Sequence, residues 1–186
     1  MQEITLLNQK CLANMPILLD TIKVSLGKLR HIFNNIYDEF KIFVTNELSS
    51  ASYTVMEYEG NDSVDGFGVE SQNLSPQIEI SQMFTIERNY RNKRFCYEID
   101  FGYICDEYQN VIFFQLTIPE NSNASLSKIE NNLDADTMRN RNMEMGKGEN
   151  MLYLQFTVRE DLSENEIRDL YQAFKTYYIV PLLSSL

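Results

Sequence analysis

Apolar residues recur through residues 12–43 at alternating spacings of three and four, and no position of this series is polar. The spacing predicts a long amphipathic helix with one apolar stripe. From Pro16 to Leu48 such a helix is roughly 50 Å long, whereas a compact domain of this chain length is about 40 Å across. We therefore expect the helix to extend beyond its domain, to break, or to bury its far end against another chain. The stripe comprises Leu12, Met15, Leu19, Ile22, Leu26, Leu29, Phe33, Ile36, Phe40 and Phe43.

The stripe keeps one phase across Gly27, the residue at which a kink is easiest. The apolar residues stay on one side of the helix before and after Gly27, and a kinked helix would not require this. The pattern therefore favours a homodimer with a coiled-coil-like helix over a bent helix in a monomer. Upstream, residues 2–15 are expected to form a separate helix with a break near Asn14, because Pro16 lacks the N–H that a helix interior uses. The residues assigned to self-association are Leu19, Ile22, Leu26, Leu29 and Phe33.

Alternating apolar and polar residues over 95–118 predict a β-hairpin. The apolar residues occupy odd positions in its first strand and even positions in its second. A four-residue loop at 106–109 puts both sets on one face, with Phe101 opposite Phe114. The same register sets Ile99 opposite Leu116. Further strands are expected at 53–58, 64–70, 77–88 and 151–158, with a turn at 60–63.

The C-terminal part opens with a helix-start signal. Ser163 and Glu166 have the spacing of a capping box, and the helix that follows is expected to stop before Pro181. Between 119 and 150 we expect loop, with one short helix near 126–133 and a mobile loop over 140–150. Together the elements predict an α+β fold, in which the long N-terminal helix and the C-terminal helix pack on one face of a mainly antiparallel sheet of five or six strands.

The length of 186 residues fits one domain. We expect a single domain over 1–186: helical over 1–48, mainly β over 51–118, loop and short helix over 119–150, and a strand and helix over 151–182. The three cysteines cannot all pair internally, which favours a reducing compartment. With no basic leader and no apolar stretch of membrane-spanning length, we expect a cytoplasmic protein without membrane contact.

The charge is acidic and unevenly distributed. A net charge of −11 argues against direct nucleic-acid binding over the whole surface. Between Lys41 and Arg88 the chain has no basic residue, so this acidic segment could dock on the basic surface of a partner protein, or simply keep an edge soluble. The residues assigned to partner binding are Glu57, Glu59, Asp62, Asp65 and Glu70.

A basic cluster follows immediately, with four positive charges between residues 88 and 94. Such a run can hold phosphate, and Tyr90 could stack on a base. It can equally form a solvated turn or a counterpart to the acidic segment of the same chain. The candidate phosphate-binding residues are Arg88, Arg91, Lys93 and Arg94.

The candidate chemistry is sparse. His31 is the single histidine and has no identifiable catalytic partner, and no cysteine pair has metal-ligand spacing, so we expect neither a metal site nor a cofactor. On the polar face of the predicted hairpin, Asp100 lies opposite Gln115, with Glu98 beside it. This arrangement resembles the metal site of PD-(D/E)XK nucleases, although the second carboxylate is Gln115 and the expected lysine is Thr117. A solvated polar face is the other interpretation.

These patterns favour a non-enzymatic, acidic protein–protein interaction module, with the long helix for self-association and the acidic segment for a basic, nucleic-acid-binding partner. Intracellular inhibitors and antagonists have this general character. The alternative is a diverged metal-dependent nuclease-like enzyme, with Glu98, Asp100 and Gln115 as its catalytic residues.

Overall fold

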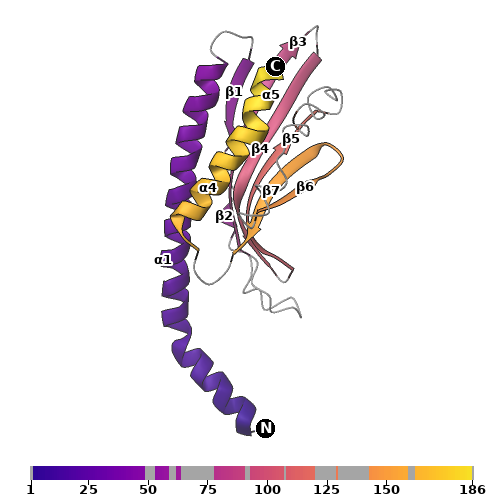
Figure 1. Ribbon diagram of the computed structural model, residues 1–186. Helices are drawn as coiled ribbons and strands as arrows, with labels where there is room; N and C mark the ends of the chain where they lie inside the picture. The colour runs from indigo at the N-terminus through magenta and orange to yellow at the C-terminus, as the bar shows by residue number, and fades with distance from the viewer. Residues whose placement is uncertain are drawn as a thin grey trace. The chain divides into compact units, whose positions relative to one another are not determined.

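The computed structural model describes residues 2–48, 53–58, 62–63, 78–90, 93–106, 108–119, 129, 143–158 and 162–185 (Figure 1). Residues 2–13, 15–16, 18–19, 53–58, 62–63, 88–90 and 185 are described by their backbone alone. The chain divides into two compact units, Met1–Ile32 and Phe33–Leu186. The described part of the first unit is helical throughout, and the second unit contains the sheet and the C-terminal helices.

The predicted long helix is present as α1 (Gln2–Glu47), which has 46 residues. The predicted break near Asn14 is wrong, since α1 continues through Pro16. The proline removes one backbone hydrogen bond, and the helical turns on both sides are long enough to tolerate that loss. α1 ends at Glu47, one residue before the predicted end at Leu48, whose N–H still donates a hydrogen bond to the carbonyl of Val44, at 3.0 Å.

The part of α1 that belongs to the second unit follows the predicted stripe as far as Phe40. Phe33, Ile36, Phe40 and Val44 have no exposed surface, so the buried face continues at Val44, whereas the predicted Phe43 is only half-buried. The ring centroid of Phe40 lies 5.0 Å from that of Phe84, in an edge-to-face arrangement. Burying four such side chains stabilises the fold by about 1.5–3 kcal/mol each. This half of the stripe therefore forms the core of its own chain.

The sheet is antiparallel and has seven strands in the order β1-β3-β4-β5-β7-β6, with β2 also paired to β3. The predicted α+β class is confirmed. The sheet is six strands across, as predicted, because β2 pairs with β3 and lies outside the main strand order. The bounds are β1 (Tyr53–Tyr58), β2 (Asp62–Ser63), β3 (Ile78–Tyr90), β4 (Lys93–Cys105), β5 (Asn110–Thr117), β6 (Glu144–Lys147) and β7 (Met151–Thr157).

The hairpin of β4 and β5 has the predicted register. Phe101 pairs with Phe114 and Ile99 pairs with Leu116. The rings of Phe101 and Phe114 stack, with centroids 5.2 Å apart. In the predicted four-residue loop, the carboxylate of Asp106 accepts hydrogen bonds from two backbone N–H groups further along the turn. This local bonding stabilises the tight turn that sets the register.

Two turn predictions are wrong. β6 lies inside the expected mobile loop 140–150, and β2 lies inside the expected turn 60–63. In β6, a Cβ on Gly146 would fall 1.8 Å from the ring of Tyr153, so the strand pairs closely because the glycine leaves room for that ring. The strand predicted at 64–70 lies outside the described residues, as does the short helix over 126–133 apart from Ile129, which is helical and buried.

The C-terminal helix begins as predicted. α4 (Glu164–Phe174) has the full capping box, in which the Ser163 hydroxyl accepts from the N–H of Glu166 while the Glu166 side chain accepts from the N–H of Ser163. The expected stop before Pro181 is wrong. A π-helical turn, η1 (Lys175–Ile179), continues into α5 (Val180–Ser185). Val180 donates to the carbonyl of Lys175, five residues back, and this wider turn accommodates the proline ring.

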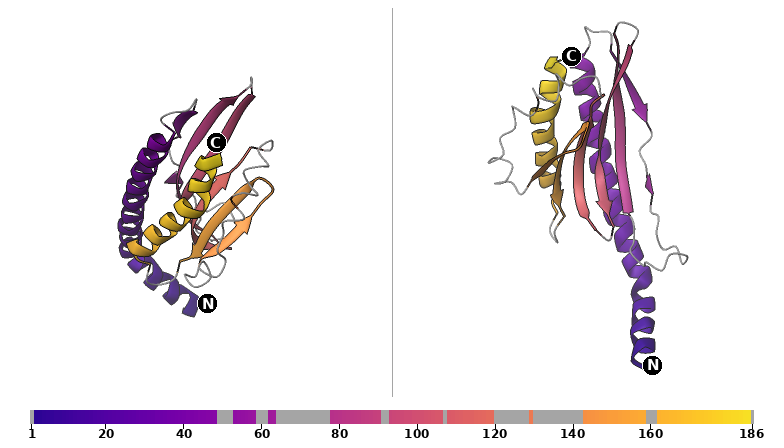
Figure 2. Two further views of the ribbon diagram at one scale, coloured as in Figure 1. Left: turned by 45° about the horizontal axis from the view of Figure 1, so that its top comes forward. Right: turned by 90° about the vertical axis from the view of Figure 1, so that its right-hand side faces the viewer.

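The helices of the second unit share one face of the sheet (Figure 2). Phe174, the last residue of α4, has its ring centroid 5.4 Å from that of Phe114 and 6.3 Å from that of Phe40. It therefore joins the sheet, α1 and α4 in one aromatic core. Tyr178 lies in the π-helical turn that follows α4, and its hydroxyl donates a 3.3 Å hydrogen bond to the carbonyl of Tyr153. The opposite face of the sheet is consequently the one on which polar chemistry can be assembled.

Candidate functional site

The face of the sheet opposite the helices collects carboxylates from three strands. Residues that pair directly across an antiparallel ladder point to the same face. Asp100 pairs with Met83, and Glu98 pairs with Thr85, so the odd positions of β3 and the even positions of β4 share this face. The alternation adds Glu79 of β3, and the pairing of Glu144 with Gln155 extends the face to β6. We call the residues Glu79, Glu98, Asp100 and Glu144 the acidic sheet face.

Asp100 is the most perturbed group of this face. Its pKa is raised to about 6, first by burial and then by the charges of Glu79 and Glu98, whereas a hydrogen bond from the backbone of Phe101 lowers it. Within the part of the chain that the structure describes, its Oδ1 atom is buried and has no hydrogen-bond partner. A buried acceptor left without a donor costs about 1–3 kcal/mol. The interpretation of this position as fully solvated is therefore not supported, since Asp100 is half-buried.

A glycine brings β3 and β4 close together beside Asp100. A Cβ on Gly102 would lie 2.1 Å from the carbonyl oxygen of Ile80, so this approach is available to glycine alone. On the neighbouring strand, the Ser81 hydroxyl donates to the carboxylate of Glu79, at 3.2 Å. Glu79 is close enough to Asp100 for its charge to add to the effect of burial, and both raise the pKa of Asp100.

The three residues of the alternative catalytic set lie side by side, as the predicted register requires. Asp100 pairs with Gln115, and Glu98 pairs with Thr117. The amide of Gln115 donates to the Thr117 hydroxyl at 3.5 Å, so it is turned along its own strand. Among the described residues, no group of three or more His, Cys, Asp or Glu side chains is arranged to hold a metal ion. The arrangement offers acceptors for hydrogen-bond donors and cations.

The basic cluster lies at the turn between β3 and β4. Arg94 forms an ion pair with Glu87, whose side chain is nearly buried on the acidic side of the sheet. This pairing matches the interpretation in which the cluster neutralises acidic residues of the same chain. Lys93 is exposed at the start of β4. Arg88 lies in β3 and is described by its backbone alone, and Arg91 is outside the described residues.

The predicted partner-binding residues are mostly outside the described part of the chain. Glu57 lies in β1 opposite Phe84, and Asp62 lies in β2 opposite Ile80, both described by backbone alone. Glu59, Asp65 and Glu70 lie outside the described residues. Of the carboxylates that do gather, Glu98 and Asp100 lie on the polar face of the predicted hairpin, whereas the sequence alone did not place Glu79 beside them.

The predicted self-association residues divide into two groups. Phe33 is completely buried, with its ring 6.2 Å from that of Phe101, and therefore belongs to the core of its own chain. Ile22, Leu26 and Leu29 are half-buried, and Leu19 lies in α1 with its side chain not described. Two apolar residues of the same helix are more open, since Ile17 is 69% exposed and Val24 is 53% exposed.

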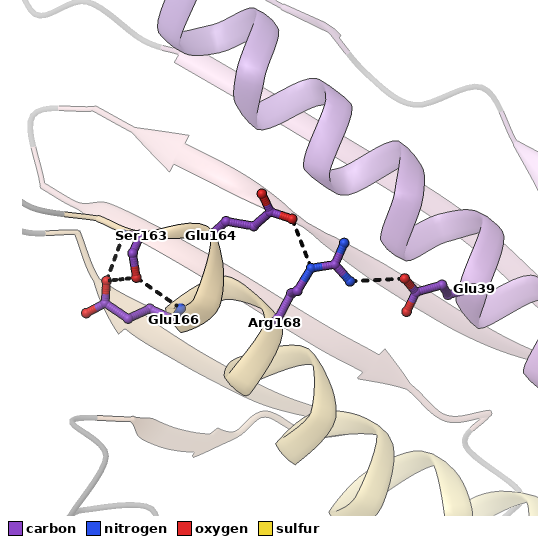
Figure 3. A network of polar contacts seen from close by, with 5 residues as sticks. All are labelled: Glu39, Ser163, Glu164, Glu166 and Arg168. Carbon is purple, nitrogen blue, oxygen red and sulfur yellow. Dashed lines mark hydrogen bonds and ion pairs between the residues drawn. The ribbon is translucent and has the colours of Figure 1, made fainter.

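A polar network joins α1 to the start of α4. Figure 3 shows Arg168 between two carboxylates, with its Nε atom 2.9 Å from Glu164 and one terminal nitrogen 3.0 Å from Glu39. Nearby, the ammonium of Lys175 lies 4.0 Å from the ring centroid of Phe43. Exposed pairs of this kind contribute about 0.2–1 kcal/mol each. We assign them to the orientation of the two helices rather than to a binding site.

Comparison with known proteins adds no family to this description. No protein-family model, no curated protein and no solved structure matches the chain. Among the described helices, none combines the length and the apolar character that crossing a membrane requires.

Proposed function

We propose that the protein is a non-enzymatic protein–protein interaction module that binds a partner with a basic surface through the acidic sheet face. One observation carries this proposal: beyond the effect of burial, the charges of Glu79 and Glu98 raise the pKa of Asp100. Repulsion from these two carboxylates acts at Asp100 and marks a region of negative potential. A basic group placed among them would relieve the repulsion, and this gain is available only in the complex.

Asp100 would interact with such a partner through its charge. Its Oδ1 atom has no donor within the described part of the chain, but the atom is buried and offers no surface to a guanidinium or ammonium group. A partner that uses its basic surface for nucleic acid would lose access to that surface when it is covered. We therefore propose that the module acts as an inhibitor or antagonist, and that it self-associates through its N-terminal helix as a homodimer.

The test compares the wild type with the double variant Glu79→Gln and Glu98→Gln as bait in a native host lysate, followed by mass spectrometry. The expected result is a basic protein that the wild type captures and the variant does not. The purified partner should associate more slowly as ionic strength rises, because exposed charges are screened. The matched control neutralises Glu47 and Asp169, which are exposed outside the acidic sheet face. Equal loss with the control variant would show that only net charge matters.

A further inference from the structure

The two units of the chain carry opposite charge. Residues 1–32 contain four basic and two acidic side chains, whereas the remaining residues contain twelve basic and twenty-five acidic ones. Net charge therefore changes sign at the boundary between the units. Two copies of the chain repel each other overall, but the first unit of one copy is attracted to the second unit of another.

The first unit presents an apolar face flanked by basic residues. Ile22, Leu26 and Leu29 recur at helical spacing and are only half-buried. Lys23 and Arg30 lie along one margin of this stripe, and both are exposed. These side chains keep part of their apolar surface exposed, so contact with another surface would bury more of it. We call the residues Ile22, Lys23, Leu26, Leu29 and Arg30 the helical docking face.

The acidic sheet face has the complementary chemistry. The half-buried Met83 pairs directly with Asp100 on this face, and Glu98 and Glu79 lie along the strands on either side of that pair. Tyr153, two strands away, is also half-buried and pairs with Gln115 on the same face. Apolar side chains with acidic neighbours fit an apolar helix stripe with a basic margin.

We propose that the helical docking face of one copy binds the acidic sheet face of a second copy. When each copy provides both surfaces, the exchange closes into a two-fold dimer. The inference rests on the proposed function and deepens it, because it names the N-terminal helix of a second copy as one basic partner of the acidic sheet face. Direct pairing of two helical docking faces is less favourable, since it would bring their basic margins together without carboxylates.

Reciprocal charge reversal tests this contact in the full chain. Sedimentation equilibrium at micromolar concentration should give a dimer mass for the wild type. Lys23→Glu with Arg30→Glu makes the helical docking face acidic, and Glu79→Lys with Glu98→Lys makes the acidic sheet face basic. Each double variant should weaken the dimer by at least about tenfold, because attraction becomes repulsion at both contacts. The chain that carries all four substitutions should regain a dimer mass, since its surfaces are complementary again.

The control reverses a charge on the same helix outside the docking face. Lys28 is also exposed, and it lies about 140° around the helix axis from Lys23. Lys28→Glu should leave the dimer mass unchanged. Circular dichroism melting of each variant shows whether the fold is intact, so that loss of the dimer cannot be attributed to unfolding.

Three results would overturn the inference. These are a monomer mass for the wild type, a four-substitution chain that stays monomeric, and a dimer that survives reversal of the acidic sheet face but is lost in Leu26→Gln. The last result would instead show pairing of the helices with each other. Binding of poly-L-lysine separates the inference from the proposed function. If a monomeric chain binds poly-L-lysine and Glu79→Gln with Glu98→Gln abolishes this binding, the proposed function stands while the dimer contact fails.

Discussion

Asp100 pairs directly with Gln115 across β4 and β5, yet neither the amide of Gln115 nor any other described group donates to the Oδ1 atom of Asp100. The amide of Gln115 is engaged with Thr117 on its own strand, at 3.5 Å. The carboxyl group thus lies near the charges of Glu79 and Glu98, and one of its two oxygens has no donor among the described residues. Such a group lowers the stability of the folded state when it is ionised.

The first prediction concerns the pH dependence of stability. The pKa of Asp100 is raised from an ordinary value of 3.8 to about 6 in the folded protein. Well below pH 4 the group is neutral in both states. As the pH rises from about 4 to about 6, the unfolded state ionises while the folded state stays protonated, and this removes about 2–3 kcal/mol of stability; above pH 6 the loss is complete. Asp100→Asn should therefore gain stability over the wild type between pH 4 and 7, with the two converging at low pH. Urea denaturation across this range measures the difference.

Asp106 provides a control in which the effect of pH on stability has the opposite sign. Hydrogen bonds from the backbone of Tyr108 and the side chain of Gln109 lower its pKa, so its charged form stabilises the folded state. Asp106→Asn should lose stability at neutral pH and approach the wild type as the pH falls through the folded pKa. If both variants shifted in the same direction with pH, the assignment of Asp100 as a strained carboxylate would be wrong.

The second prediction concerns the aromatic core. Phe101 stacks on Phe114 and contacts Phe33, and all three are completely buried. Phe101→Ala should cost about 3–5 kcal/mol, because it removes buried surface and leaves a cavity that the stacked rings cannot fill. Tyr108 is 87% exposed in the adjacent loop, and Tyr108→Ala should change the free energy of unfolding little. Equal losses at the two positions would show that the faces of the hairpin are wrongly assigned.

The third prediction compares two glycines. Gly102→Ala would place a methyl group against the backbone oxygen of Ile80, and backbone cannot move aside without separating β3 from β4. We expect a loss of about 1–3 kcal/mol, as for other overpacked sites. A methyl group on Gly27 would meet no described atom within 4 Å, so Gly27→Ala should stabilise the helix by about 1 kcal/mol. Thermal melting of both variants gives the comparison, and a stabilised Gly102→Ala would contradict the close approach.

The hairpin was predictable because two independent signals agree. Parity reverses between its strands, and the loop length fixes which residues face each other, so the pairing of Phe101 with Phe114 follows from the sequence. The end of the last helix was not predictable. Whether Pro181 stops a helix depends on whether the turn before it widens, and here the π-helical turn gives the ring its space. β6 has only four residues and no alternation, and its pairing depends on the fit between Gly146 and Tyr153.

The candidate site was predictable in part. The polar face of the hairpin identified Glu98 and Asp100, because their positions follow from the alternation of β4. The approach of Glu79 depends on the register between β3 and β4, which was not predicted. The apolar residues of β3 occupy even positions and those of β4 odd positions, so the same parity reversal as in the predicted hairpin could have indicated which residues share a face. The acidic sheet face is therefore a product of sheet topology more than of sequence proximity.

The last prediction separates the interaction module from the nuclease-like alternative. Magnesium and manganese bind oxygen ligands that converge on one point, and two carboxylates without a third ligand hold them weakly. Gln115 is turned toward Thr117, and the described residues contain no converging group of three ligands. The melting temperature of the wild type should therefore be the same with and without Mg²⁺ or Mn²⁺. A metal-dependent rise that disappears in Asp100→Ala but persists in Asp106→Ala would instead show a metal site on the acidic sheet face. That result would favour the enzyme with Glu98, Asp100 and Gln115 as its residues.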